Sequence, residues 1–141
     1  CTGAMLAHAM FELPLVEYSL HARTGIGQWL GEFVATFGLL LVVIAHRRSE
    51  DAPWMVAAWI AGAYWFTSST SFANPAITVA RSLSNTFAGI APSNTAAFIV
   101  AQFLGALAAL PVARILLLRE AAIARAPTGP HPALDSSPDG P

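Results

Sequence analysis

Long runs without charged residues alternate with short polar breaks along this chain. Residues 28–45 carry one charge, Glu32, while residues 52–80 and 82–113 carry none. Because about 20 apolar residues span a hydrocarbon core of about 30 Å, this pattern predicts three membrane-crossing helices. We expect them at about 28–46, 53–70 and 94–118.

A short helix is predicted between the second and third crossings. Asn74 is a favoured N-cap residue, Pro75 suits the first helical position, and Gly89 is a natural helix stop. A helix over about 75–88 reaches only about 21 Å, so it can enter a bilayer but cannot cross it. Backbone that breaks at mid-membrane is tolerated only where protein or a water-filled cavity surrounds it. The segment is therefore typical of a half-helix that lines a permeation path.

The two ends of the chain differ from these runs. The chain begins at Cys1, and residues 1–16 are apolar but interrupted by polar residues and proline, so we interpret them as the end of a truncated crossing. An outer loop is expected at 17–27. The last residues are rich in Pro, Gly, Ser and Asp, so 119–141 is predicted to be a disordered cytoplasmic tail.

Composition excludes several classes of function. Apolar residues make up 55% of the chain and charged residues 11%, against about 25% charged in soluble proteins. A net charge of -1 gives no field that attracts nucleic acid. The single cysteine excludes an intrachain disulfide, and no Cys, His and carboxylate cluster has metal-ligand spacing. We therefore predict no metal, no cofactor and no enzymatic activity.

Arginine placement predicts the orientation. Arg47 and Arg48 follow the first full crossing, while Arg114 lies near the end of the last one and Arg119 and Arg125 follow it. Both groups fall on one side, which the positive-inside rule makes cytoplasmic. The half-helix then enters from the outside, with its N-terminus near the middle of the membrane.

The sequence Ser-Phe-Ala-Asn-Pro-Ala-Ile-Thr-Val-Ala-Arg at 71–81 resembles the re-entrant Asn-Pro-Ala loop of the aquaporin and glycerol-facilitator superfamily, the major intrinsic proteins. The context of this segment agrees with a re-entrant loop, since the segment follows an uncharged crossing and begins a helix that is too short to cross the membrane. The resemblance covers about residues 1–118, with 28–118 as the C-terminal repeat. It implies an all-α membrane protein with three transmembrane helices plus one re-entrant half-helix, which is half of the family's six-helix fold.

The resemblance implies a passive channel for water or small neutral solutes that excludes protons and ions. It further implies a homotetramer in the bilayer, multi-pass in a bacterial inner membrane. The side-chain amide of Asn74 can donate to a passing water or hydroxyl oxygen, and the helix N-terminus disfavours cations. Pro75 leaves no extra N–H group at the helix start, and Ala76 is small enough for a second loop to pack against it.

Glu32 is the one ionisable group within the first full crossing, where a charge costs a few kcal/mol and needs a partner. The spacing from Glu32 to Thr36 resembles the family's Glu-x-x-x-Thr pattern, in which the carboxylate braces the re-entrant loop. The alternative is a glutamate near the membrane surface, because Trp29 is also typical of the interface.

The family's selectivity filter can be carried over by counting from Asn74. Gly62 stands where water-selective members carry His, Ser71 is small and polar, and Ile77 stands where most members carry the filter arginine. Arg81 lies one turn further along and is assigned to the outer vestibule, with a snorkelling arginine as the alternative. The pattern predicts a wide throat, similar to that of members linked to arsenic resistance. Glycerol and metalloid acids such as arsenous acid are then permeants as credible as water.

Three alternatives remain. An ion-coupled secondary transporter also uses broken helices but normally needs more intramembrane charges than Glu32. An intramembrane hydrolase could use Ser68, Ser69 or Ser71, although no Gly-x-Ser-x-Gly motif and no deep His accompany them. The chain could also be an inactive half-channel.

Overall fold

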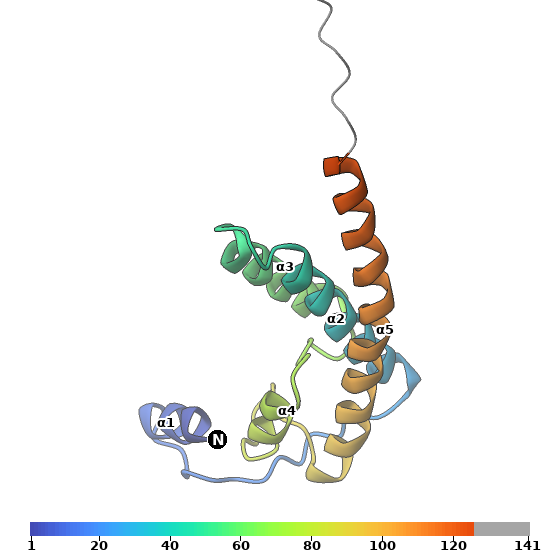
Figure 1. Cartoon of the computed structure of the whole chain (residues 1–141). Coiled ribbons are helices and arrows are strands. Elements are labelled where there is room, and N and C mark those ends of the chain that lie inside the picture. Colours follow the sequence, from blue (N-terminus) through green and yellow to red (C-terminus); the bar gives the residue numbers. More distant parts are fainter. Residues whose placement is uncertain (126–141) are drawn as a thin grey trace, which may run out of the picture.

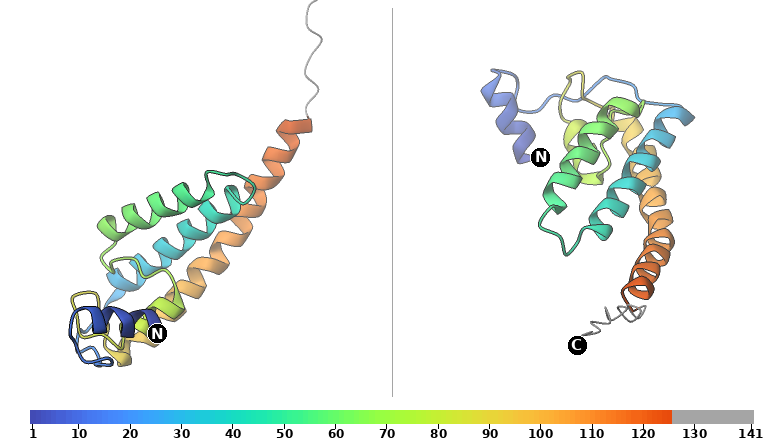
Figure 2. Two further views of the ribbon diagram at one scale, coloured as in Figure 1. Left: turned by 90° about the vertical axis from the view of Figure 1, so that its left-hand side faces the viewer. Right: turned by 90° about the horizontal axis from the view of Figure 1, so that it is seen from above.

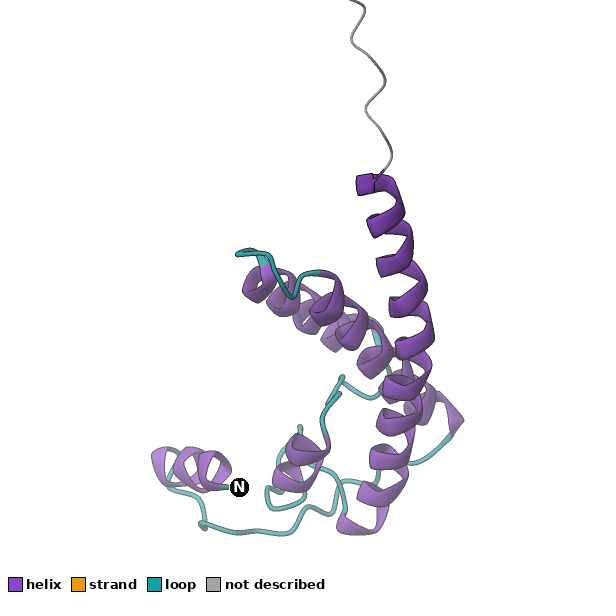
Figure 3. Ribbon diagram, in the orientation of Figure 1, coloured by secondary structure: helices purple, strands orange, loops and turns teal. Residues whose placement is uncertain are grey.

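The computed structural model describes residues 1–125, and this part of the chain contains helices and loops but no strand (Figure 3). The helices are α1 (Thr2–Met10), α2 (Ile26–Ala45), α3 (Ala52–Phe66), α4 (Pro75–Arg81) and α5 (Pro92–Arg125). The fold is therefore all-α, as predicted. Most of the predicted tail, 126–141, lies outside the described residues.

Helix α2 is the centre of the arrangement. It packs along α5 on one side and α3 on the other, so the three long helices lie side by side (Figure 2). The short α4 lies against the first part of α5, and α1 lies apart from the three long helices (Figure 1). The side chain of His8 ties α1 to the rest, because its ring nitrogens lie 2.6 Å from the Pro14 carbonyl oxygen and 2.8 Å from the Ser84 hydroxyl.

Two of the described helices are long and apolar enough to cross a membrane. They are α2 and the Pro92–Arg119 part of α5, with mean hydropathies of 1.8 and 2.1. Helix α3 is shorter, since its 15 residues reach about 22 Å. It ends before Thr67, whose hydroxyl donates to the Ala63 carbonyl at 2.6 Å. The layout of three crossings and one half-helix therefore stays a prediction.

The half-helix is shorter than expected. The prediction of about 75–88 is wrong at its C-terminal end, because α4 stops at Arg81 after 7 residues. Ser82 directly follows the helix, and its hydroxyl donates to the Val79 carbonyl at 2.7 Å. Hydroxyl and amide side chains compete for backbone hydrogen bonds in this way and favour turns, and three more of them, at Ser84, Asn85 and Thr86, follow.

The last helix runs past its expected end at 118. It continues to Arg125, because six of the seven residues of 119–125 are Arg, Glu or Ala, which favour helix. The first helix, in contrast, ends at Met10, six residues short of 16 (16 − 10).

Small residues let α5 approach α2 closely. Ala101, Ala109 and Ala113 are buried on this face of α5. A Cβ atom added to Gly105 would collide with the backbone carbonyl oxygen of Phe33 in α2. Van der Waals packing of small residues drives such contacts between membrane helices.

Replacing Gly105 by alanine is therefore expected to destabilise the folded protein by about 1–3 kcal/mol, because backbone must move to admit the methyl group. Gly3→Ala is the matched control, since a Cβ atom on Gly3 meets nothing within 4 Å. The free energy of unfolding, measured by denaturant titration in detergent micelles, should fall only for Gly105→Ala. Equal changes in the two variants would contradict close packing at this point.

Candidate functional site

Asn74 caps α4, as the sequence predicts. Its backbone is extended, with φ -157 and ψ 121, and Pro75 follows as a first-turn residue. The Asn74 side-chain Oδ1 accepts a hydrogen bond of 2.8 Å from the backbone N–H of Ala76. Because the oxygen is used in this cap, the Nδ2 amide group stays available as a donor on an exposed side chain.

The connection that leads into this cap has an unfavourable backbone. Thr70, Ser71 and Ala73 have φ values of 62, 47 and 49, which place three residues with side chains in the left-handed region. Such a conformation costs roughly 1–2 kcal/mol per residue, and more for β-branched threonine. Specific contacts must therefore hold the segment in place.

Glu32 supplies two of these contacts. Its side chain is 0% exposed, its Oε1 accepts from the Phe72 N–H at 2.8 Å, and its Oε2 accepts from the Ala73 N–H at 2.9 Å. The prediction that Glu32 hydrogen-bonds backbone in this segment is confirmed, and the carboxylate does not point to the membrane surface. The two bonds satisfy two buried backbone N–H groups and hold the loop against α2.

Gln102 joins this network from α5. Its Nε2 donates to Glu32 Oε2 at 2.6 Å and to the Thr78 hydroxyl at 2.8 Å, so one side chain links α2, α4 and α5. Gln102 is not among the residues predicted for the site. The available signal was that Gln102 is the one polar residue within the apolar run 96–113.

Thr36 takes no part in the network. It is buried one turn further along α2, and its Oγ1 has no hydrogen-bond partner among the described residues. Glu32 and Gln102 therefore hold the Asn-Pro-Ala segment together, and Thr36 makes no hydrogen bond to it.

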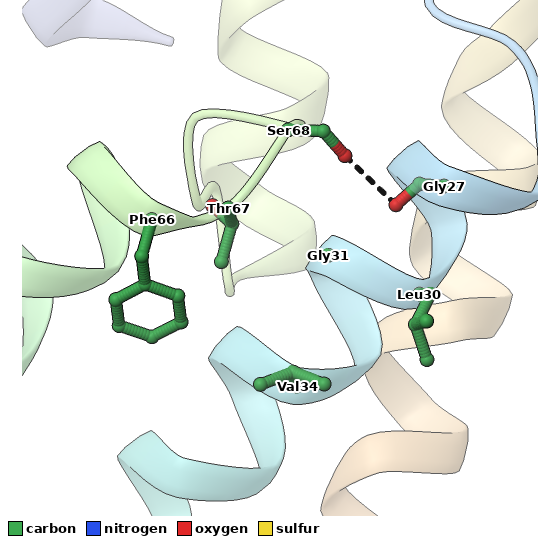
Figure 4. A pocket seen from close by; sticks show the side chains of 7 residues that line it. All are labelled: Gly27, Leu30, Gly31, Val34, Phe66, Thr67 and Ser68. Carbon is green, nitrogen blue, oxygen red and sulfur yellow. Dashed lines mark hydrogen bonds between the residues drawn. The ribbon is translucent and has the colours of Figure 1, made fainter.

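The serines before the cap have structural contacts. The Ser68 hydroxyl donates to the Gly27 carbonyl at 2.8 Å, and Ser69 is fully buried beside Gly31. A cavity of about 260 Å³ lies next to Ser68, between α2 and the end of α3 (Figure 4). Its walls are mostly apolar and include none of the three residues assigned to the filter. No His is hydrogen-bonded to these serines in the described part of the chain, so the hydrolase alternative gains no support.

The residues assigned to the filter lie on three different segments. Gly62 is exposed on α3, and a Cβ atom added there meets nothing within 4 Å among the described residues. Ser71 is 8% exposed, and its Oγ has no partner in this part of the chain. Ile77 is 42% exposed, one turn after Asn74 on α4. The stretch around the cap thus offers an open glycine, one hydroxyl and one apolar side chain.

Arg23 is a second residue that the sequence analysis did not assign to the site. It lies in the connection before α2 and is 3% exposed. Burial lowers the pKa of Arg23 from its ordinary value, and the nearby Arg81 guanidinium lowers it further. Arginine nevertheless remains protonated in proteins, so the buried connection contains a positive charge. No group of three or more potential metal ligands occurs among residues 1–125.

The chain is similar to the aquaglyceroporin AqpS of Rhizobium meliloti (strain 1021). The two are 51% identical over 117 residues, which cover 82% of this chain and 50% of the relative. The chain thus spans about half the length of this relative. No protein-family model and no solved structure matches the chain.

Proposed function

Because the chain belongs to the aquaporin and glycerol-facilitator superfamily, we propose that it forms the C-terminal half of a passive channel. The permeants are water and small neutral solutes of the size of glycerol and arsenous acid, and protons and ions are excluded. The observation that carries this proposal is the Asn74 cap of α4, held in place by the buried Glu32 carboxylate.

The cap supports transport of hydroxylated solutes. Since Asn74 Oδ1 is bonded to its own helix, the Nδ2 amide can donate to the oxygen of a passing molecule. A neutral solute or water then exchanges hydrogen bonds at this point without a large barrier. Pro75 removes one competing donor beside the amide.

The throat proposed from Gly62, Ser71 and Ile77 is wide and partly apolar. The open space at Gly62 and the exposed Ile77 side chain support this proposal. A wide throat favours solutes larger than water, so glycerol and arsenous acid are included.

Neither an ion-coupled transporter nor an inactive half-channel is favoured. An ion-coupled transporter needs a carboxylate that can release and rebind an ion, whereas Glu32 is fully buried and accepts three hydrogen bonds. An inactive half-channel is the second alternative. The small and exposed Ala76 at the start of α4 instead supports packing of a further half against this end of the helix. We further propose a multi-pass protein of the inner membrane that assembles as a homotetramer.

The test uses the complete channel, meaning this chain together with the residues that correspond to the rest of the relative's length. In vesicles, stopped-flow light scattering should detect water and glycerol flux, arsenous acid uptake should be measurable, and a pH dye should detect no proton flux. Asn74→Asp is the matched variant, because aspartate caps a helix equally well but lacks the amide donors. We expect it to fold and to lose solute flux several-fold. A complete channel that passes neither water nor glycerol, or that conducts protons, would contradict the proposal.

A further inference from the structure

Two arginines and one aromatic ring lie together beside the Asn-Pro-Ala segment. The Phe72 side chain is 2% exposed, and its ring centroid lies 4.3 Å from Arg81 Cζ and 5.1 Å from Arg23 Cζ. A guanidinium group over an aromatic ring is stabilised by the ring's quadrupole, most strongly where water is excluded. The backbone N–H of Phe72 donates to Glu32, and its ring packs against that of Phe98 with centroids 5.4 Å apart, so both backbone and ring are held in place.

The two arginines differ in how their donors are used. Arg23 donates to three backbone carbonyls, those of Gly89 at 2.7 Å, Ser69 at 3.0 Å and Phe87 at 3.0 Å. These bonds tie the connection before α2 to the segments on either side of α4. Arg81 is partly exposed, and its buried Nη1 has no hydrogen-bond partner among the described residues. Arg23 therefore anchors these backbone segments, whereas the Arg81 guanidinium lies over the Phe72 ring and leaves Nη1 without a hydrogen bond in the described part of the chain.

Arg81 also lies on the face of α4 that carries the proposed pore residues. Asn74, Ile77 and Arg81 are spaced by three and four positions, which places them along one stripe of the helix. Arg81 ends the helix, one turn beyond Ile77, on the side that the arginine distribution predicts to be outside.

The proposed channel needs a source of positive charge. Ile77 brings none, and a helix of 7 residues has a smaller dipole than the half-helix expected from the sequence. The charges of Glu32 and Arg23 are both buried and bonded to backbone, whereas Arg81 is partly exposed, so the Arg81 guanidinium is the charge that a solute meets at the entrance. A net positive potential at this point opposes cations and leaves neutral solutes unaffected.

We propose that Arg81 is the residue that discriminates against cations at the outer entrance, and that Phe72 is its positioning residue. Selection by charge at Arg81 is then separate from selection by size at Gly62, Ser71 and Ile77. The inference rests on the proposed channel function.

The test compares two probes of nearly the same size and planar shape, neutral urea and the guanidinium cation, in vesicles that contain the complete channel. Arg81→Gln removes the charge but keeps a shorter, neutral side chain with N–H donors. We expect the ratio of guanidinium to urea permeability to rise about tenfold in this variant, with urea permeability within about twofold of the wild type. Arg81→Lys should keep the low ratio.

Phe72 and Arg23 provide the positioning test and the control. Phe72→Leu should raise the ratio of guanidinium to urea permeability several-fold, because the Arg81 guanidinium loses the aromatic ring on which it lies. Phe72→Tyr keeps an aromatic ring and should therefore keep the wild-type ratio. Arg23→Gln removes the other guanidinium charge that lies near the Phe72 ring, and it also breaks three hydrogen bonds to backbone carbonyls. It should lower the amount of folded channel without raising the ratio.

The failure of this inference differs from the failure of the channel proposal. A wild-type channel that passes urea, with a ratio unchanged by Arg81→Gln, would overturn the role of Arg81 alone. A ratio raised equally by Arg23→Gln would overturn it as well, because the charge would then act without regard to position. A complete channel that passes no neutral solute would refute the proposed function and this inference together.

Discussion

Replacing Glu32 by leucine is expected to abolish the proposed channel, with a loss of at least about tenfold in both folded protein and glycerol flux. The change removes the acceptor for the buried N–H groups of Phe72 and Ala73, and each unsatisfied group costs about 1–3 kcal/mol. Three residues of this segment have an unfavourable backbone conformation. Without the two hydrogen bonds to Glu32, we expect the segment to leave that conformation. The yield after size-exclusion chromatography and the stopped-flow glycerol rate measure the two effects.

Two further variants should lose less folded protein and less glycerol flux than Glu32→Leu. Glu32→Gln keeps one acceptor oxygen but sets an NH₂ group against a backbone N–H donor, so we expect an intermediate loss. Gln102→Leu leaves both backbone bonds of Glu32 intact and removes only the link to α5, so its loss should be the smallest of the three. A Glu32→Leu channel with wild-type flux, or a Gln102→Leu channel as defective as Glu32→Leu, would contradict the proposed role of the carboxylate.

Local chemistry explains which parts of the site could be predicted. The start of α4 follows from two adjacent residues, because Asn74 caps a helix through its own side chain and Pro75 fits the first turn. The need of Glu32 for a buried partner follows from the cost of burying a charge, and the resemblance to the family's Glu-x-x-x-Thr pattern implies that the partner is the loop. The long apolar runs likewise correspond to α2 and α5.

Other parts depend on competition or on tertiary packing and could not be located in this way. Gly89 is the natural stop of the half-helix by sequence, but the hydroxyl of Ser82 competes for backbone hydrogen bonds seven residues earlier. The partner of Glu32 on α5 depends on how α2 and α5 cross, which no local pattern fixes. Gln102 was therefore missed, although its position within an apolar run marks it as a buried polar residue that needs partners. Arg23 was missed for a similar reason, because its three acceptors are backbone carbonyls far along the chain.

The double variant Gly62→His, Ile77→Arg is expected to turn the proposed wide throat into a narrow one. A histidine at position 62 has room at its Cβ atom, and an arginine at position 77 replaces a side chain that is 42% exposed. Both changes add bulk and donors where the proposed filter lies, so they should exclude glycerol-sized solutes more than water. In vesicles of the complete channel, glycerol flux should fall by about tenfold or more, while water flux should fall by less than about threefold.

Matched substitutions on the same helices separate a filter effect from a general disturbance. Ala61→His adds the same side chain one position earlier on α3, and Val79→Arg adds the same charge at a residue of α4 that is 44% exposed but on another face. Neither should change the ratio of glycerol to water flux. Arg81→Gln should leave this ratio unchanged too, because that residue is proposed to act on charge rather than size. If Arg81→Gln alone controls glycerol passage, or if the double variant still passes glycerol freely, the filter lies elsewhere than at the positions counted from Asn74.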